Sequence, residues 1–396
     1  MGYRTYTCPI ARQCGGCEWL SVPYPIQLKR KQEAIAQLFG DLAQADGCEI
    51  STIVGMDEPR AYRYKAATPF APGTRGRIRS GFFAQGTHRI VPCAECLVEE
   101  LSLRPILNSV ARVAERVGVS AYHEDKGSGL LRHAIVRKAM VGGEILLTIV
   151  TNGNHIPQEL RFVDGILSAH PEITTIVQNV NTRRTNAMLG SRNNVLYGKG
   201  IIHDSLLGCT FELGATSFYQ TNPSQTEKLY ALAIKSAQLE PGMRLLDAYC
   251  GTGTIGLCAA HSCKDLQLVG VERGEEAIVN AKRNARANHL EQAARFVRAD
   301  ATEYLAGSKR SNKMHSSAYY DVIMLDPPRA GSTPEFLSAA SACNPKRIVY
   351  ISCNPQTQAR DLWFLRQKGW KLDSLTPVDM FPHTKHVETV VSMSKE

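Results

Sequence analysis

The feature that most constrains the fold is a regular alternation of strand-like and helix-like segments after Gln220. Short apolar runs alternate with segments whose apolar residues recur at helical spacing. The strand candidates are Arg244–Ala248, Leu266–Glu272, Ala294–Ala299, Val322–Leu325 and Arg347–Ser352, and the helix candidates are Thr254–Ala260, Glu275–Asn288 and Pro334–Ala340. This alternation predicts an α/β fold with a doubly wound parallel sheet. Two further extended runs, Lys371–Asp379 and Val387–Met393, are expected to form a hairpin at the edge of that sheet.

A glycine-rich turn, within Leu245–Gly256, follows the first of these strands. Ligands of such sheets bind where the carboxyl ends of the strands meet. Glu272 ends the next strand, 21 residues after Gly251, where an acid can accept both hydroxyls of a ribose. Asp300 ends the third strand, placed to meet an adenine amino group, and Asp326-Pro327-Pro328-Arg329 follows the fourth. The arrangement resembles a class I (Rossmann-like) methyltransferase domain using S-adenosylmethionine. An NAD or nucleotide-binding domain is the alternative.

Cys353 ends another strand of the same sheet and is therefore expected to face the glycine-rich turn. A thiolate that adds to carbon 6 of a uracil makes carbon 5 nucleophilic, and a base must then remove the carbon-5 proton. Glu388 can be that base if the sheet edge desolvates its carboxylate, and nearby cations such as Arg329 are expected to lower the pKa of Cys353. The plainer alternatives are a buried structural cysteine and a solvated glutamate on an edge strand.

Four sequence blocks make the resemblance specific. They are Ser217–Pro223, Asp326–Gly331, Ser352–Pro355 and Asp379–Thr384, the last followed by Glu388. In this order they resemble the signature blocks of the RNA uracil-C5 methyltransferases. The resemblance implies Cys353 as the nucleophile and Glu388 as the proton acceptor. The S-adenosylmethionine site that it implies consists of Gln220, Tyr249, Thr254, Glu272, Asp300 and Asp326.

Five cysteines near the start of the chain suggest a metal centre. Cys8, Cys14 and Cys17 with one later cysteine resemble the [4Fe-4S] site of the iron–sulfur members of this family, and the resemblance implies Cys96 as the fourth ligand, with Cys93 as its competitor. From spacing alone, Cys14 and Cys17 with Cys93 and Cys96 fit a zinc site equally well. The remaining cysteines outside the catalytic site are interpreted as structural: Cys48, Cys209, Cys250, Cys258, Cys263 and Cys343.

The first half of the chain is predicted to be an α+β domain that carries the iron–sulfur cluster and binds RNA. A helix is expected at Tyr24–Leu38, and glycines 142 and 143 mark a hairpin between Ala134–Met140 and Glu144–Thr151. A further helix is expected at Pro157–Ala169 and strands at Thr174–Val180 and Ile201–Leu207. We expect residues 1–20 and 50–215 to form this domain, and residues 21–49 and 216–396 to form the methyltransferase domain.

Basic side chains interleaved with aromatic ones in the first half favour single-stranded or looped nucleic acid as a partner, and a solvated charged surface is the plainer alternative. The basic residues are Lys29, Arg30, Lys31, Arg60, Arg63, Lys65, Arg75, Arg77, Arg79, Arg183 and Arg184, in a chain of net charge +9. Arg63 and Lys65 are the preferred RNA contacts. The family resemblance implies uracil 747 of 23S rRNA as the target, with a tRNA uracil 54 as the alternative. A non-catalytic iron–sulfur RNA-binding factor is a second alternative. The composition and the absence of a long apolar run predict a cytoplasmic protein.

Overall fold

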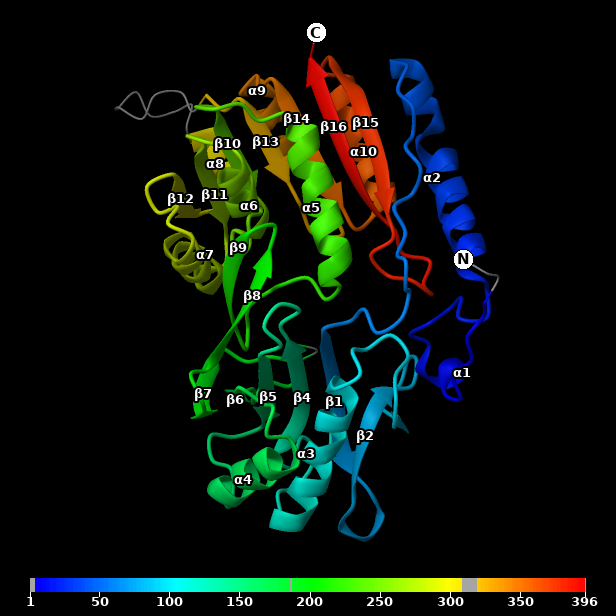
Figure 1. Cartoon of the computed structure of the whole chain (residues 1–396), viewed down its shortest axis with the longest axis vertical. Coiled ribbons are helices and arrows are strands. Elements are labelled where there is room, and N and C mark those ends of the chain that lie inside the picture. The colour runs from blue at the N-terminus through cyan, green and yellow to red at the C-terminus, as the bar shows by residue number, and fades with distance from the viewer. Residues whose placement is uncertain (1–3, 186, 308–318, 396) are drawn as a thin grey trace.

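Two seven-stranded sheets lie one above the other along the long axis of the molecule (Figure 1). This computed structural model describes residues 4–185, 187–307 and 319–395. The lobe drawn at the top of Figure 1 contains the second half of the chain, and the lower lobe contains most of the first half. A two-stranded sheet, β8 (Ile201–Leu206) and β9 (Cys209–Gly214), lies where the chain passes from one lobe to the other.

The upper sheet has the order β12-β11-β10-β13-β14-β16-β15. Its first five strands are parallel and β15 and β16 are antiparallel, so the predicted doubly wound sheet with a closing hairpin is confirmed. The strands are β10 (Arg244–Ala248), β11 (Gln267–Glu272), β12 (Ala294–Arg298), β13 (Val322–Leu325), β14 (Arg347–Ser352), β15 (Trp370–Val378) and β16 (Glu388–Lys395). The helices of this lobe are α5 (Pro223–Ala237), α6 (Thr254–Ser262), α7 (Glu275–Ala287), α8 (Ala301–Gly307), α9 (Pro334–Ala342) and α10 (Pro355–Arg366).

The two faces of this sheet belong to two separate hydrophobic cores. Successive side chains of a strand point to opposite faces, so Leu245 packs with α5, α6 and α7 whereas Leu246 packs with α8, α9 and α10. Both residues are almost completely buried. The sheet is therefore covered on both sides, which leaves its strand ends as the place for a ligand.

The helix α2 (Tyr24–Asp46) joins the upper lobe although it lies near the start of the chain (Figure 1). The predicted helix Tyr24–Leu38 is confirmed and extends further, to a left-handed Gly47. Ile35 and Phe39 of α2 are buried in the same core as α9 and α10. The chain then runs beside β15 through parallel bridges from Ile50 and Val54, which cover the edge of the sheet.

The lower sheet has the order β3-β2-β1-β4-β5-β6-β7 and is antiparallel except between β5 and β6, as predicted for an α+β domain. The expected hairpin is confirmed as β4 and β5. The strands are β1 (Lys65–Pro72), β2 (Ile78–Phe83), β3 (Ile90–Pro92), β4 (Leu131–Lys138), β5 (Ile145–Thr151), β6 (Thr175–Val180) and β7 (Arg192–Tyr197). The helices are α1 (Ala11–Cys14), α3 (Leu103–Val117) and α4 (Glu159–Ala169), and α3 and α4 pack on the sheet to form a third core.

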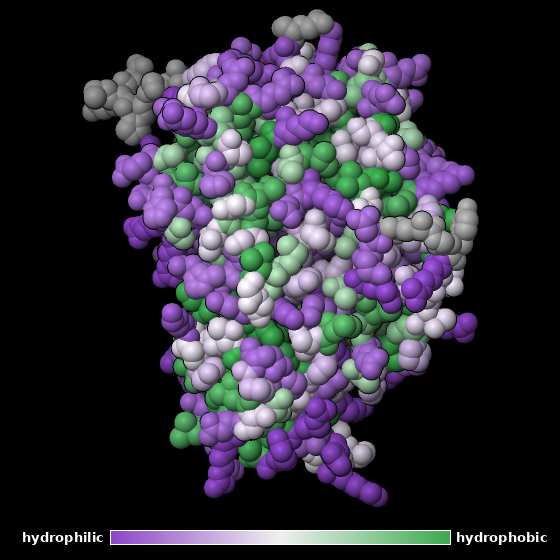
Figure 2. Space-filling model, in the orientation of Figure 1, coloured by the Kyte–Doolittle hydropathy of each residue, from purple (hydrophilic) through white to green (hydrophobic). Residues whose placement is uncertain are grey.

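The face seen in Figure 1 mixes hydrophilic and hydrophobic side chains, with hydrophilic ones dense at both ends of the molecule (Figure 2). Within the described part of the chain, none of the helices has the length and apolarity that crossing a lipid bilayer requires.

Candidate active site

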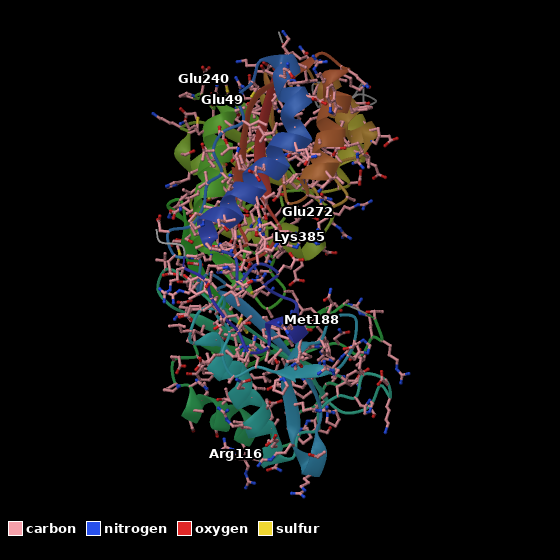
Figure 3. The ribbon with its side chains drawn as sticks, turned by 90° about the vertical axis from the view of Figure 1, so that its right-hand side faces the viewer. Glu49, Arg116, Met188, Glu240, Glu272 and Lys385 are labelled. Atoms are coloured by element: carbon pink, nitrogen blue, oxygen red, sulfur yellow. The ribbon has the colours of Figure 1, made fainter. Side chains whose placement is uncertain are left out.

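A cavity of about 940 Å³ opens at the carboxyl ends of the parallel strands, on the side of the upper lobe that faces the lower lobe. Figure 3 places Glu272, one of its lining residues, at this end of the lobe. The cavity brings together every predicted catalytic and cofactor-binding residue: Gln220, Tyr249, Thr254, Glu272, Asp300, Asp326, Cys353 and Glu388. Residues spread over 169 positions of the chain (388 minus 220, counting both ends) therefore form one site.

The glycine-rich turn between β10 and α6 forms one wall. Its backbone is left-handed at Tyr249 (φ 64°), Gly251 (φ 53°) and Gly253 (φ 79°). A tyrosine in this region is strained, which is characteristic of functional turns. A Cβ at Gly251 would meet no other atom within 4 Å, so the missing side chain leaves room against the backbone. The turn therefore allows a ligand to approach the main chain closely.

Two carboxylates at the ends of β11 and β12 border this turn. Glu272 accepts hydrogen bonds from the backbone N–H groups of Gly251 (3.3 Å) and Gly274 (2.8 Å). Asp300 accepts from the N–H groups of Thr302 and Glu303 at the start of α8, and it pairs with Arg273 at 3.2 Å. Both carboxylates are fixed by local contacts, and each retains lone pairs for further donors.

Cys353 and Glu388 lie opposite each other across two neighbouring strands. In the antiparallel pair β14–β16 the last aligned residues are Ser352 and Thr389, so the next step of the register sets Cys353 against Glu388. Opposed residues point to the same face with Cβ atoms about 4.5–5.5 Å apart. Both side chains line the cavity. The register thus brings a nucleophile and a base to one side of a ligand.

Glu388 is buried because β16 lies between β14 and β15 and not at the edge of the sheet. Its side chain is only 4% exposed, so the alternative of a solvated glutamate on an edge strand is wrong. Burial, reinforced by Asp326, raises the pKa of Glu388 to about 8, and burial raises the pKa of Asp326 to about 7. The expected desolvation of this carboxyl group is confirmed.

The pKa of Cys353 departs from the sequence-based expectation. Arg329 does lower it, but burial and the carboxylates of Glu388 and Asp326 act more strongly, and the net effect raises the pKa above its usual value. The position of Cys353 at a strand end is enough to predict Arg329 as its neighbour. It does not reveal that Glu388 approaches from another strand.

Several cavity residues were not singled out from the sequence. Phe218, Phe381 and His386 line it and lie in or beside the blocks that carry the family resemblance, so that signal was available. Phe218 is 67% exposed, and a large exposed aromatic ring next to Gln220 is a surface on which a base can stack. Tyr230 and Arg273 also line the cavity, and Tyr230, buried in α5, had no distinguishing sequence signal.

The lower lobe contributes Arg63 to the cavity. Its guanidinium lies 5.6 Å from the centre of the Phe381 ring, while its Nε is buried without a hydrogen-bond partner. Lys65, the other preferred RNA contact, is half-buried at the start of β1 and lies outside the set of lining residues. Lys31, counted above among the basic RNA-binding candidates, is 1% exposed and paired with Asp379, so this part of the basic cluster is not a surface.

The N-terminal cysteines gather beside the lower sheet. Burial, followed by the thiols of Cys96, Cys14 and Cys8 in that order, raises the pKa of Cys17 to about 12. Cys93 donates its S–H to the carbonyl of Glu95, whereas Cys96 is the thiol that acts most strongly on Cys17. Within residues 4–185, 187–307 and 319–395, however, no three His, Cys, Asp or Glu side chains are arranged to hold a metal ion. Cysteine thiolates are suitable ligands for a metal centre, but these described residues do not form a complete set of ligands.

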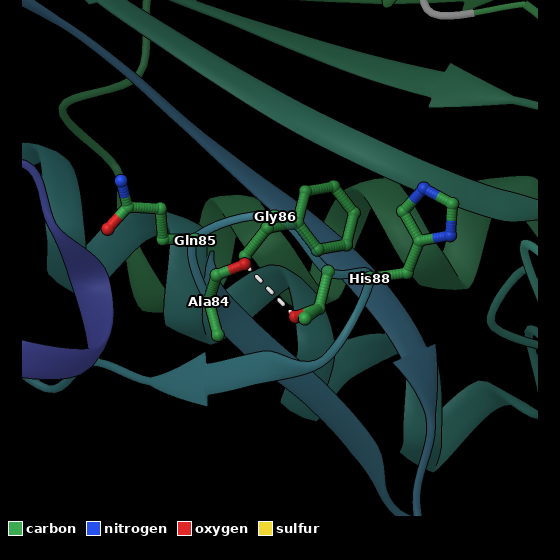
Figure 4. Close-up of a pocket in the computed structure, with 6 residues that line it drawn as sticks. Ala84, Gln85, Gly86 and His88 are labelled. Carbon is green, nitrogen blue, oxygen red and sulfur yellow. Dashed lines mark hydrogen bonds between the residues drawn. The ribbon is translucent and has the colours of Figure 1, made fainter.

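A second hollow of about 430 Å³ lies at the turn between β2 and β3 (Figure 4). Its walls are residues 83–88 of that turn, and Thr87 closes the turn by donating to the carbonyl of Ala84 at 3.0 Å. None of the predicted site residues lines it, so the cavity at the strand ends is the candidate active site.

Comparison with known proteins agrees with this site. A family model described as tRNA (Uracil-5-)-methyltransferase matches residues 202–396. An uncharacterized RNA methyltransferase of Bacillus cereus (strain ATCC 10987) is 38% identical over 391 residues, covering 98% of this chain and 82% of that protein. Another, from Staphylococcus aureus (strain MRSA252), is 40% identical over 383 residues, covering 97% of this chain and 83% of that protein.

A solved structure extends the similarity to the whole fold. The Pyrococcus abyssi tRNA (uracil-54, C5)-methyltransferase, in complex with S-adenosyl-L-homocysteine, matches 98% of this chain and 87% of its own with a TM-score of 0.77 and 26% sequence identity. The relatives match nearly the entire chain, and the family model spans all of the cavity-lining residues except Arg63. The chain therefore belongs to the family of RNA uracil-C5 methyltransferases.

Proposed function

We propose that this protein transfers a methyl group from S-adenosylmethionine to carbon 5 of a uracil in RNA, with Cys353 as nucleophile and Glu388 as base. The observation that carries the proposal is the register of β14 and β16, which sets these two side chains opposite each other in the cavity that also contains the glycine-rich turn. A cofactor site alone would not call for a thiol at this place.

S-adenosylmethionine supplies a methyl group attached to a positively charged sulfur, which a carbon nucleophile can attack. Tyr249, Thr254 and Gly251 would hold its amino-acid part, because they line the cavity at the glycine-rich turn, where the missing side chain of Gly251 leaves the main chain accessible. Glu272 and Asp300 would hold its ribose and adenine, because each carboxylate is already fixed at a strand end and has lone pairs left. Gln220 and Asp326 complete the site next to Cys353 and would face the methyl group and the base.

The protein side of the reaction has three steps. The thiolate of Cys353 forms a bond to carbon 6 of the uracil, and the electron pair of the carbon 5–carbon 6 double bond moves into the ring as an enolate. After carbon 5 has gained the methyl group, the carboxylate of Glu388 takes the carbon-5 proton. The electron pair of that C–H bond restores the double bond and expels the Cys353 thiolate. Arg329 assists by favouring the ionised thiol.

The proposed target is a uracil in an unstacked or looped RNA, because a base inside a helix hides carbon 6. The resemblance described above favours uracil 747 of 23S rRNA and hence a role in rRNA processing in the cytoplasm. The similarity to the Pyrococcus abyssi enzyme, which acts on uracil 54 of tRNA, favours tRNA as the second candidate. Arg63 is proposed to contact the RNA from the lower lobe, supported by its position in the lining of the cavity.

We further propose that Cys8, Cys14, Cys17 and Cys96 hold a [4Fe-4S] cluster, supported by the mutual influence of their thiols. A zinc site held by Cys14, Cys17, Cys93 and Cys96 is the alternative; within the described residues no three donor side chains are arranged to hold a metal ion, which favours neither centre. Iron, sulfide and zinc analysis of anaerobically purified protein tests this assignment. Zinc without iron would refute it.

The experiment that tests the main proposal combines nucleoside mass mapping with two variants. The purified protein should form 5-methyluridine when given S-adenosylmethionine and either 23S rRNA or tRNA, and the mapped position identifies the target. Cys353→Ala should abolish methylation because no enolate forms. Glu388→Gln should accumulate protein joined covalently to RNA, because the carbon-5 proton stays and the thiol cannot leave. Methylation by Cys353→Ala would refute the mechanism.

A further inference from the structure

A buried ion pair joins α2 to the turn between β15 and β16. Nζ of Lys31 lies 2.6 Å from Oδ1 of Asp379, and the two side chains are 1% and 0% exposed. Tyr24 donates its hydroxyl proton to the other carboxylate oxygen of Asp379 at 2.8 Å, and Lys31 also donates to the carbonyl of Phe381 at 3.2 Å. Two side chains near the start of the chain thus hold a turn about 350 residues later.

Gln27, one helical turn before Lys31, holds the second half of the same turn. Its Oε1 accepts the backbone N–H of His383 at 2.9 Å, and its Nε2 lies 3.1 Å from Nδ1 of the His383 ring. The other ring nitrogen, Nε2, lies 2.9 Å from the carbonyl of Pro59. The Nε2 atom of Gln27 can only donate a hydrogen bond, so Nδ1 of His383 must accept it. The proton of the neutral His383 ring is therefore on its own Nε2, which donates to Pro59.

This network is more than a way to bury polar groups. A buried ion pair stabilises a fold little compared with apolar side chains of the same volume, so stability alone does not account for it. What it does supply is geometry, because each bond fixes one point of the turn. The turn itself presents Phe381 and His386 to the cavity and ends at Glu388, the first residue of β16.

We propose that α2, through Lys31 and Gln27, is a positioning element that fixes the turn and thereby aims Glu388 at carbon 5 of the bound uracil. This inference rests on the proposed function, in which Glu388 removes the carbon-5 proton. Lys31, Gln27 and Asp379 are positioning residues, because none of them lines the cavity as described. A displaced base is expected to slow proton removal while the addition of Cys353 to the ring continues.

Two double variants separate positioning from stability. Lys31→Met with Asp379→Leu removes the buried charges together with their hydrogen bonds, whereas Lys31→Gln with Asp379→Asn removes the charges and keeps groups that can bond to Tyr24 and to the Phe381 carbonyl. Turnover on ordinary RNA should fall roughly 10- to 100-fold in the apolar pair, as expected for a displaced catalytic group. The amide pair should retain most of the wild-type rate. Thermal unfolding of both variants verifies that they are folded.

RNA containing 5-fluorouridine supplies the decisive readout. Its carbon-5 fluorine cannot be removed as a proton is, so adduct formation on this RNA reports the steps before Glu388 acts. The apolar pair should form the covalent adduct at close to the wild-type rate although its turnover is slow. Unchanged turnover, or an equal loss of turnover and adduct formation, would overturn the positioning role. A wild-type protein that forms no adduct would instead refute the proposed function, and the inference with it.

Discussion

Three ionisable side chains, Asp326, Cys353 and Glu388, share one cavity, and the pKa of each is raised. Burial is the first cause for all three; Asp326 also raises the pKa of Glu388, and both carboxylates raise the pKa of the thiol. A carboxyl group with a pKa of about 8 is a much better proton acceptor than one in water. The same environment makes ionisation of the thiol more difficult, so the site favours the base at the expense of the nucleophile.

The first prediction concerns the pH dependence of catalysis. Both Glu388 and Cys353 must be ionised, and the pKa of each is raised, so kcat/KM should rise steadily from about pH 6 to about pH 9. Asp326→Asn should shift this rise to lower pH, because the charge of Asp326 raises the pKa of both groups. The measurement is the methylation rate over this pH range, with cofactor binding verified by calorimetry. A maximum near neutral pH would contradict the prediction.

The second prediction links Glu388 to stability. Its pKa is raised from the usual 4.5 to about 8, so between these pH values the folded protein keeps a proton that the unfolded chain has lost, and stability falls as pH rises. The Glu388→Gln variant has no titrating group at this position, so its stability lacks this pH-dependent loss. Its free energy of unfolding, relative to wild type, should therefore increase by about 2 to 4 kcal/mol from about pH 5 to about pH 8. Urea unfolding at both pH values measures this. A difference that does not change with pH would refute it.

At the scale of elements, the glycine-rich turn shows how local geometry limits substitution. Gly253 is left-handed (φ 79°), and a Cβ there would lie 2.9 Å from the Phe296 ring of β12. Gly242, in the turn before β10, has nearly the same φ of 81°, but a Cβ there would meet nothing within 4 Å. A side chain introduced at either glycine would therefore have the same unfavourable left-handed backbone, and the two positions differ in how crowded the new Cβ would be.

This contrast gives the third prediction. Gly242→Ala should cost about 1 to 2 kcal/mol of unfolding free energy from the left-handed backbone alone. Gly253→Ala should cost a further roughly 1 to 3 kcal/mol from overpacking against Phe296, and it should weaken S-adenosylmethionine binding because the turn moves. Urea unfolding and calorimetry test both variants. Equal losses in stability, or unchanged cofactor affinity in Gly253→Ala, would contradict the crowding argument.

The elements whose bounds the sequence predicts best are short buried apolar strands flanked by clear turn signals. β10, β13 and β14 agree with the predicted ranges to the residue. The helices α3, α5 and α10 were not predicted. In α3 the buried residues Leu103, Ile106, Leu107 and Val110 have helical spacing, so the sequence pattern is sufficient to predict this helix. In α10 the exposed Trp363 and the alternation of buried and polar positions obscure that spacing, and only packing on the sheet defines the helix.

At the scale of the whole molecule, the two lobes are connected through contacts that no local pattern reveals. Arg137 of β4, which is 4% exposed, donates to the carbonyl of Ser217 at 2.8 Å. It thereby holds the segment that carries Gln220 and Phe218 into the cavity. The identities of the site residues could be predicted from the blocks in which they lie. The depth of Glu388, the burial of Lys31 and the support from Arg137 depend on long-range packing and could not.

A substrate that enters the cavity is expected to contact both lobes. Arg63 reaches the cavity from the lower lobe, and Arg183 and Arg184 are exposed on the loop after β6. Met188 of the same loop lies on the side of the lower lobe that faces the labelled Glu272 and Lys385 of the upper lobe (Figure 3). A net charge of +9 adds a general attraction for phosphates. We therefore predict that the loop after β6 binds the RNA backbone.

The fourth prediction tests this placement through the salt dependence of RNA binding. Each phosphate contact to a single strand contributes about 0.7 to the slope of log affinity against log salt concentration. The double variant Arg183→Gln/Arg184→Gln should reduce that slope by about 1.4. The matched control Lys235→Gln/Lys368→Gln removes two exposed charges at the far ends of α5 and α10, away from the cavity, and should leave the slope unchanged. Equal slopes for the two double variants would mean that net charge alone attracts the RNA, and that the loop after β6 does not bind it.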